Sequence, residues 1–445
     1  MTSSNGDRSV FNSDWDQYID GWAGVTGQAP AVLSVYLQAH SSGFTSVAQS
    51  VSLENSVTIH PVTDTAPRTG LDSHRGLREA STVDRSPLTT GNVVHDLSVG
   101  GNVPMGQLPT CPDNVAWRIV ERIAEAYRSV MSPSLALPRV DVKITKRIPL
   151  SAGLGSKAAD VAAAIVAADR FFGYHFIVRA MGFSAPGGTE TSSVGSLSSN
   201  VIRRIAREEC PDEYTAIELA LEGGTSLINL DHNAQPRSDV TTQRTPLLAQ
   251  GPLWWVITMP VVTSPEMAMP WAAPSPPREE QAAQPHHNPS AQHSDDEDED
   301  VDESGAGLCH RVVERLAVQR AEMASGKRSQ YRVGNIEDIE RALVSCDPTD
   351  VAKTMGNDLY PAATSVVPSL RRVIQAGTRA GALGTIVAQQ GPACAMLCVD
   401  EDHARDVQAE LAGSGVVRTA RIAPSHRPGN QSGAHLVSDE DKKSP

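Results

Sequence analysis

The chain of 445 residues is poor in aromatic residues, cysteine, positive charge and long apolar runs. Its formal net charge of -14 excludes the usual class of nucleic-acid-binding proteins, which present a basic face. Its six cysteines form no CxxC pair, so neither a metal site nor a dense disulfide framework is predicted. The apolar runs are too short to span a bilayer, and the amino terminus lacks the basic start and apolar core of a signal peptide. These absences favour a protein of the reducing cytoplasm that binds neither nucleic acid nor a membrane.

Much of the acidic excess is concentrated in one segment, "DDEDEDVDE", at residues 295–303. A run of like charges repels itself and stays solvated. Residues 260–310 around it are rich in Pro, Gln and acids, and cannot bury enough apolar surface to order themselves. We therefore predict a disordered insertion here.

The chain is long enough for two hydrophobic cores, and its composition divides it into five ranges. We predict a flexible amino terminus over residues 1–27 and an ordered first domain over 28–259, followed by the insertion over 260–310. A second, smaller domain is predicted over 311–422, and a flexible tail over 423–445.

Local patterns within the first domain predict strands, a long loop and a helix. The segment "APAVLSVYLQAH" alternates as a strand does. Residues 62–110 are polar and rich in Gly, Pro and Thr, which is typical of a surface excursion. The segment "PDNVAWRIVERIAEAYRSVM" has helical spacing, with Asp113 or Asn114 placed to cap its start. The predicted apolar face of this helix consists of Ala116, Ile119, Val120, Ile123 and Tyr127.

The most informative segment is "IPLSAGLGSKAAD" at residues 148–160, which joins an alternating strand to an alanine-rich helix through two glycines. Such a turn leaves backbone N–H groups unpaired at the helix start, where they form an anion site, commonly for phosphate. The segment is neither a Walker motif nor GxGxxG, so a plain helix-entry turn is the alternative. Other charged candidates for a site near this turn are Lys146, Arg147, Asp160 and Asp358.

The order of several motifs gives a resemblance to a known family. "KRIPLSAGLGSKAADVAAA" resembles the Pro-x-x-x-Gly-Leu-Gly-Ser-Ser-Ala motif of the GHMP small-molecule kinases, most like the 4-diphosphocytidyl-2-C-methyl-D-erythritol kinase family. "APAVLSVYL", "SGFTSV", "PDNVAWRIV" and "LALEGGTSL" resemble further motifs of that family in the same order. "GNDLYPAATSVVPSLRRVIQAG" and "GALGTIVAQQGPACAMLCVDEDHARDVQAEL" are similar to its carboxy-terminal domain. The resemblance covers most of the predicted ordered chain.

The resemblance implies an α+β fold of two domains with the active site in the cleft between them. The first domain would be of the ribosomal protein S5 domain 2-like type, and the second a smaller α/β sandwich. It also implies that ATP, carried with Mg²⁺, phosphorylates a hydroxyl of a CDP-linked methylerythritol in non-mevalonate isoprenoid biosynthesis. The ATP-binding residues carried over from the family motif are Pro149, Ser151, Ala152, Gly153, Leu154, Gly155, Ser156, Lys157 and Ala158.

The chain departs from the family pattern at two positions where the family has charged residues that take part in phosphoryl transfer. Val32 occupies the position of the family's lysine, and Ala216 that of its aspartate, with Asp212 and Glu213 close by. Loss of both charges is expected to reduce the rate by several powers of ten. Lys157 is a candidate substitute cation, because a flexible lysine at a helix start can reach phosphate oxygens. As an alternative, it is an exposed residue of the first helical turn.

The implied substrate-binding residues combine aromatic, polar and glycine positions. Phe44 stands where the family has an aromatic that stacks on cytosine, and Thr45 stands at the neighbouring histidine position. Trp254 or Trp255 is a candidate for the facing ring, and Gly391 remains from a glycine-rich segment. Membership of the hydrophobic core is the alternative for all three aromatic residues.

Three functions remain open on these residues. The first is a divergent kinase that uses Lys157. The second is a catalytically impaired paralogue that binds a nucleotide or regulates another protein. The third is a structural partner that contacts another protein through the acidic segment. Homodimerisation and pairing with another protein are both compatible with the sequence.

Overall fold

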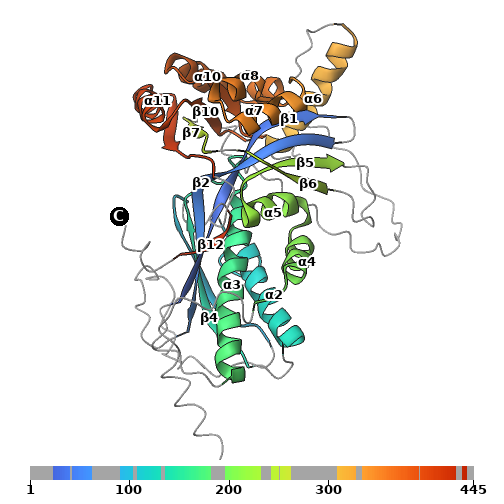
Figure 1. Ribbon diagram of the computed structural model, residues 1–445, viewed down its shortest axis with the longest axis vertical. Helices are drawn as coiled ribbons and strands as arrows, with labels where there is room; N and C mark the ends of the chain where they lie inside the picture. Colours follow the sequence, from blue (N-terminus) through green and yellow to red (C-terminus); the bar gives the residue numbers. More distant parts are fainter. Residues whose placement is uncertain are drawn as a thin grey trace, which may run out of the picture.

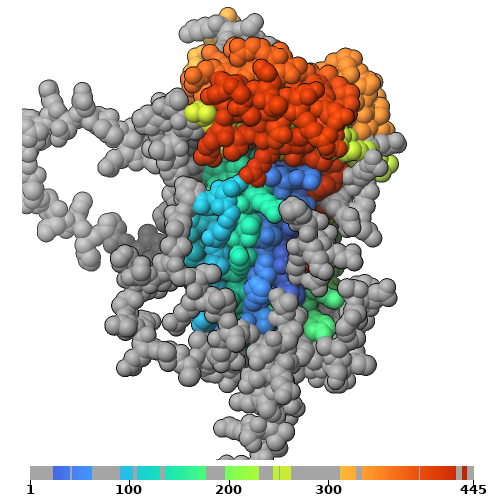
Figure 2. Space-filling view, turned by 90° about the vertical axis from the view of Figure 1, so that its left-hand side faces the viewer, coloured from blue at the N-terminus to red at the C-terminus, as the bar shows by residue number. Residues whose placement is uncertain are grey.

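The computed structural model describes residues 24–40, 43–62, 91–103, 108–131, 136–181, 196–231, 242–249, 251–261, 308–326, 333–389, 391–426 and 433–437. Two units lie one above the other in Figure 1, with helices and strands in both. The space-filling view shows the second unit, in orange and red, seated on the blue and green first unit (Figure 2). The α+β class predicted from the sequence is confirmed.

The first unit is built on an eight-stranded sheet whose longest strands are β1 (Val25–Ala39) and β2 (Gly43–Pro61). These two strands pair antiparallel along most of their length, with the sheet path running β12-β1-β2-β4-β3. The remaining strands are β3 (Val94–Gly101), β4 (Val140–Lys146), β5 (Thr225–Asp231), β6 (Thr242–Leu247), β8 (Gly356–Asn357) and β12 (His435–Leu436).

Helices cover one face of this sheet, as Figure 1 shows. The central helix, α3 (Ser156–Met181), packs on β1 so closely that a Cβ at Gly27 would lie 2.4 Å from the carbonyl oxygen of Ala163. The alanine-rich sequence of α3 permits this approach, since small side chains keep the helix near the sheet. The other helical elements of this layer are α2 (Val115–Ala126), the π-helical turn Tyr127–Met131, α4 (Ser199–Glu209), the 3₁₀ turn η2 (Pro211–Glu213) and α5 (Tyr214–Glu222).

The start and the buried face of α2 are as predicted. The Asn114 side chain caps the helix by accepting a hydrogen bond from the Ala116 N–H at 2.9 Å. All five residues of the predicted apolar face are buried. A cap of this kind stabilises a helix by about 1 kcal/mol, and here it also fixes the loop that precedes α2.

The second unit has a four-stranded sheet in the order β11-β7-β10-β9, covered by helices. Its core contains Cys394 and Cys398, whose thiols are buried. The strands are β7 (Trp254–Pro260), β9 (Gly384–Val387), β10 (Cys394–Cys398) and β11 (Val417–Ile422). The helices are α6 (Leu308–Ala324), α7 (Ile336–Ser345), α8 (Pro348–Thr354), α9 (Tyr360–Val366), α10 (Ser369–Arg379) and α11 (Glu401–Gly413).

The sheets divide the chain differently from the predicted ranges. Strand β7 falls before the expected boundary at residue 260, yet it pairs with β10 and β11 in the second sheet. Strand β12 falls in the range predicted to be a tail, yet it pairs with β1. Strand β3 lies within residues 62–110, where we predicted only a surface excursion. Residues 63–90 of that excursion, most of the insertion at 260–310, and residues 1–23 and 438–445 lie outside the described residues.

Candidate active site

A cavity of about 680 Å³ lies where the two units meet. It is bordered by β1, β2 and the end of β4, by the turn at residues 150–155 and by the head of α3. The loop before α2 and the junction of η2 with α5 border it on another side. The second unit contributes Gln389 and Gly391. Its volume lies within the usual range of ligand sites, about 300–1,000 Å³.

The predicted glycine turn forms one wall of this cavity. Gly153 has φ +76° and Gly155 has φ +65°, both in the left-handed region that favours glycine. A Cβ at Gly153 would lie 2.2 Å from the carbonyl oxygen of Ala388 in the second unit. The turn is fastened to β1 by a 3.0 Å hydrogen bond from the Val32 N–H to the Leu154 carbonyl. Glycine is therefore required at residue 153 both by the backbone angle and by the neighbouring loop.

Directly after the turn, α3 begins at Ser156 and points its amino-terminal end into the cavity. The first N–H groups of any helix have no partner within the helix and carry its positive dipole end. The Ser156 hydroxyl does not face them, because it donates to the Ile148 carbonyl at 3.1 Å. The first turn of α3 can thus bind an anion through its backbone.

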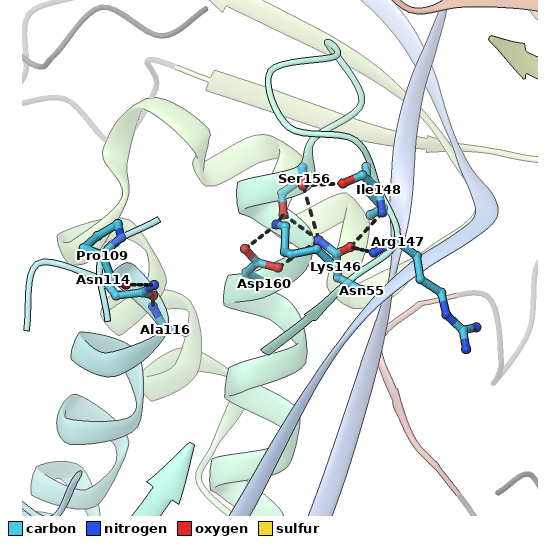
Figure 3. A network of polar contacts seen from close by, with 9 residues as sticks. All are labelled: Asn55, Pro109, Asn114, Ala116, Lys146, Arg147, Ile148, Ser156 and Asp160. Carbon is cyan, nitrogen blue, oxygen red and sulfur yellow. Dashed lines mark hydrogen bonds and ion pairs between the residues drawn. The ribbon is translucent and has the colours of Figure 1, made fainter. Parts of the chain in front are cut away.

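A buried ion pair lies beneath this wall (Figure 3). The Lys146 ammonium is 2.5 Å from a carboxylate oxygen of Asp160 and also donates to the Ser156 carbonyl at 3.1 Å. The side chains of Lys146 and Asp160 are only 1% and 8% exposed. Lys146 was a candidate for a site near the turn, and α3 covers it. Burial lowers the pKa of Lys146 and raises the pKa of Asp160, and the attraction between the two charges opposes both changes.

Asn55 of β2 completes the network. Its amide donates to Asp160 at 2.8 Å and to the Ser156 carbonyl at 3.0 Å. Its side-chain oxygen accepts from the backbone N–H groups of Arg147 and Ile148, both at 2.9 Å. The exposed Arg147 side chain points away from the network (Figure 3). The network fixes the end of β4 relative to the head of α3, and so fixes the glycine turn between them.

The loop from the second unit is held by Asn357 of β8. Its amide donates to the carbonyls of Val387 and Gln389 at 2.9 and 2.7 Å. Gln389 has φ +47°, an uncommon conformation for a residue with a side chain. A Cβ at Gly391 would lie 2.2 Å from the Ala152 carbonyl oxygen. The two units therefore meet backbone to backbone at the cavity, which only glycines at residues 153 and 391 permit.

Val32 and Ala216, the two residues that we aligned with the family's lysine and aspartate, also border the cavity. Val32 is 2% exposed, and its Cβ lies 3.3 Å from where a Cβ of Gly155 would be. Ala216 lies in the second turn of α5 and borders the same cavity. Near Ala216 lie Asp212 and Glu213, and Lys157 enters the cavity from the head of α3. Burial raises the pKa of Glu213, Asp212 adds to the rise, and the Lys157 charge opposes it.

The other predicted residues are brought to the cavity only in part. Phe44 borders it, whereas the Thr45 hydroxyl lies within hydrogen-bond distance of His40 and Asn229, at 2.8 and 2.9 Å. Trp254 lies on β7 and does not border it, and Trp255 is fully buried in the core, which was the alternative for these rings.

Three further predicted positions lie beside the cavity or away from it. Pro149 and Ala158 support the turn without bordering the cavity. Asp358 accepts backbone hydrogen bonds from Ala39 and Val333, both at 3.0 Å, and so fastens the second unit to β1.

Asn55 and Arg118 were not predicted as residues of the site, and Asp113 was predicted only as a possible helix cap. Asn55 is fully buried among alternating apolar residues of β2, and a polar residue at such a position was the available signal. Arg118 pairs with Glu209 at 3.0 Å and donates to the Asp113 carbonyl at 2.8 Å.

In the part of the chain that the structure describes, no three His, Cys, Asp or Glu side chains come together as a metal site. Across the same ranges no helix is long and apolar enough to cross a membrane.

Comparison with known proteins gives matches in both units. The model of the GHMP kinases N terminal domain matches residues 114–181, and that of the GHMP kinases C terminal domain matches residues 339–416. A 4-diphosphocytidyl-2-C-methyl-D-erythritol kinase of Saccharopolyspora erythraea is 31% identical over 334 residues, covering 75% of this chain and 76% of that protein. A kinase of the same name from Rhodococcus jostii is 47% identical over 108 residues, which are 24% of this chain and 33% of the relative.

A solved structure agrees with these matches at the level of the fold. The homoserine kinase of Cytophaga hutchinsonii covers 94% of this chain and 98% of its own, with a TM-score of 0.51 at 15% identity. That identity is low enough for the likeness to concern the fold alone. Both domain models, the long match to the Saccharopolyspora kinase and the turn at the head of α3 lead to one conclusion: the chain belongs to the GHMP kinases, as a divergent relative of the 4-diphosphocytidyl-2-C-methyl-D-erythritol kinases.

Proposed function

We propose that the chain is an ATP-dependent kinase that phosphorylates a hydroxyl of a CDP-linked methylerythritol in the cytoplasm. The observation that carries this proposal is the glycine turn, which presents the head of α3 to a cavity between the two units. The relatives named for this activity support the choice of substrate.

The residues present fit the polyphosphate of ATP. Gly153 and Gly155 allow the left-handed turn that leads into α3, and the first N–H groups of this helix are free of intrahelical partners. Mg²⁺ would be carried mainly by phosphate oxygens, since such ions in kinases need only one or two protein carboxylates. Bound ATP supplies the phosphoryl group, and Phe44 borders the cavity where a cytosine ring could stack.

A second candidate function is nucleotide binding without turnover. It is favoured by Val32 and Ala216, which present only methyl groups to the cavity at the two positions where the family has charges. A protein of this kind would bind ATP through its glycine turn and report that binding to a partner.

One pair of measurements separates these functions. Calorimetry with ATP and ADP tests binding, and release of ADP in the presence of cytidine-diphosphate-methylerythritol tests turnover. Binding with turnover supports the kinase, and binding without turnover supports the second function. If neither nucleotide binds to the folded full-length chain, both functions are rejected.

A further inference from the structure

Glu213 borders the cavity but makes no hydrogen bond that would stabilise the helix it begins. It is the N-cap residue of α5, yet its side chain makes no capping hydrogen bond. The side chains that cap a helix by accepting a hydrogen bond from one of its first N–H groups are mainly those of Asn, Asp, Ser and Thr, so a Glu at this position does little to stabilise α5. Within the described part of the chain, no hydrogen bond or ion pair engages the Glu213 carboxylate. The carboxylate borders the cavity instead.

Lys157 is likewise a charged residue at the start of a helix, α3, that it does not stabilise. It is the second residue of α3, where the helix dipole disfavours a positive charge. Its exposed side chain borders the same cavity and lies near enough to Glu213 for the two charges to interact. Residues that break a local rule of stability without a local gain are typical of functional sites.

Both residues lie next to the positions that have lost their charges. Glu213 precedes Ala216 by three residues, which is about one helical turn, and both border the cavity. Lys157 follows Gly155 by two residues, and Gly155 is in contact range of Val32. Among the charged side chains that border the cavity, Glu213 and Lys157 are therefore a carboxylate and an ammonium close to these two positions.

We propose that Glu213 and Lys157 form a relocated catalytic pair for phosphoryl transfer. This inference rests on the proposed kinase function. The acceptor hydroxyl oxygen forms a bond to the γ-phosphorus of ATP, and the bond from that phosphorus to the bridging oxygen breaks. ADP leaves, the hydroxyl proton passes to Glu213 and then to solvent, and Lys157 neutralises the oxygens of the transferred group.

The surroundings of Glu213 suit a general base. Burial is the main cause of its raised pKa, and the neighbouring Asp212 adds to it. Lys157 from α3 opposes this rise. A glutamate with a raised pKa is a stronger proton acceptor than an ordinary glutamate. Asp212 is exposed, so its solvated carboxylate lacks this property.

The test compares full-length variants supplied with ATP and cytidine-diphosphate-methylerythritol. Glu213→Gln is expected to lower kcat about 100-fold, the usual loss when a general base is removed, with the ATP dissociation constant unchanged. Glu213→Asp is expected to recover part of this loss. Lys157→Met is expected to lower kcat about 100-fold, as removal of one charge-stabilising group does. Glu410→Gln on α11 and Lys143→Met on β4 remove exposed charges away from the cavity and serve as matched controls.

Each outcome decides the inference. An unchanged kcat in Glu213→Gln, with thermal unfolding showing a folded variant, overturns it. Binding of ATP by the wild type without turnover also overturns it and leaves nucleotide binding as the function. Failure of the wild type to bind ATP rejects the proposed function itself, which is a different result from either of these.

Discussion

The two sides of the cavity have different physical properties. The head of α3 has two glycines at left-handed angles, free backbone donors and a buried ion pair beneath it. Elsewhere on the cavity wall, β1 and α5 present the uncharged residues Val32 and Ala216. The head of α3 has what is needed to bind an anion, whereas Val32 and Ala216 carry no charge that could act on one. Binding and chemistry are therefore separable here, and variants can test each side alone.

The largest effect, a loss of free energy of unfolding, is expected from breaking the buried ion pair beneath the glycine turn. Lys146→Met leaves the Asp160 carboxylate buried without its cation, and breaking a buried pair in this way costs about 3–5 kcal/mol. Urea unfolding would measure the loss. Lys143→Met, an exposed lysine on the same strand, is the control and should change the free energy of unfolding little. Equal losses in the two variants would show that the buried pair does not hold the turn.

The next largest effect, a loss of ATP affinity, is expected from disturbing the contact between the glycine turn and the second unit. Gly153→Ala places a Cβ against the Ala388 carbonyl and adds about 1–2 kcal/mol of left-handed backbone strain. We expect the ATP dissociation constant to rise about 100-fold, equivalent to about 2.7 kcal/mol, as calorimetry can show. Gly224→Ala has the same φ of +76° but no atom within 4 Å of its Cβ. It shares the strain without the overlap, so similar ATP binding by both variants would contradict the role of this contact.

A smaller effect, a gain in kcat, is expected from placing charged side chains at residues 32 and 216. In a background of Glu213→Gln with Lys157→Met, the added changes Val32→Lys and Ala216→Asp should raise kcat about 10-fold, because they return an ammonium and a carboxylate to the cavity. The coupled assay for ADP release measures this gain. A folded quadruple variant that binds ATP but shows no gain would mean that the alignment of these two positions is wrong.

The smallest expected effect is the contribution of Glu213 to the pH dependence of the free energy of unfolding. A raised pKa in the folded state means that Glu213 stabilises the fold at low pH, and that this contribution is lost as pH rises through the folded pKa. Above the folded pKa the buried charge therefore destabilises the fold. In that pH range Glu213→Gln should raise the free energy of unfolding by less than about 1 kcal/mol, and the gain should vanish in acid. A gain that persists in acid would argue against ionisation as its cause.

The sequence predicted local features well where the signal lay within a few neighbouring residues. The glycine turn followed from "GLG" between a strand and a helix, and the cap of α2 followed from Asn114. The network under the turn was not predicted, because Asn55 and Asp160 are 105 residues apart. The candidate role of Trp254 as a facing ring was left open for a related reason, because only the structure shows that β7 belongs to the second sheet.

The sequence by itself determined the turn, the helices and the likeness to the GHMP kinases, because backbone angles and apolar periodicity are encoded by adjacent residues. Only the tertiary structure decided that Lys146 is buried rather than solvated, and that Glu213 and Lys157 border one cavity. These facts depend on which distant segments pack together, since burial and the distance between charges are properties of the assembled chain.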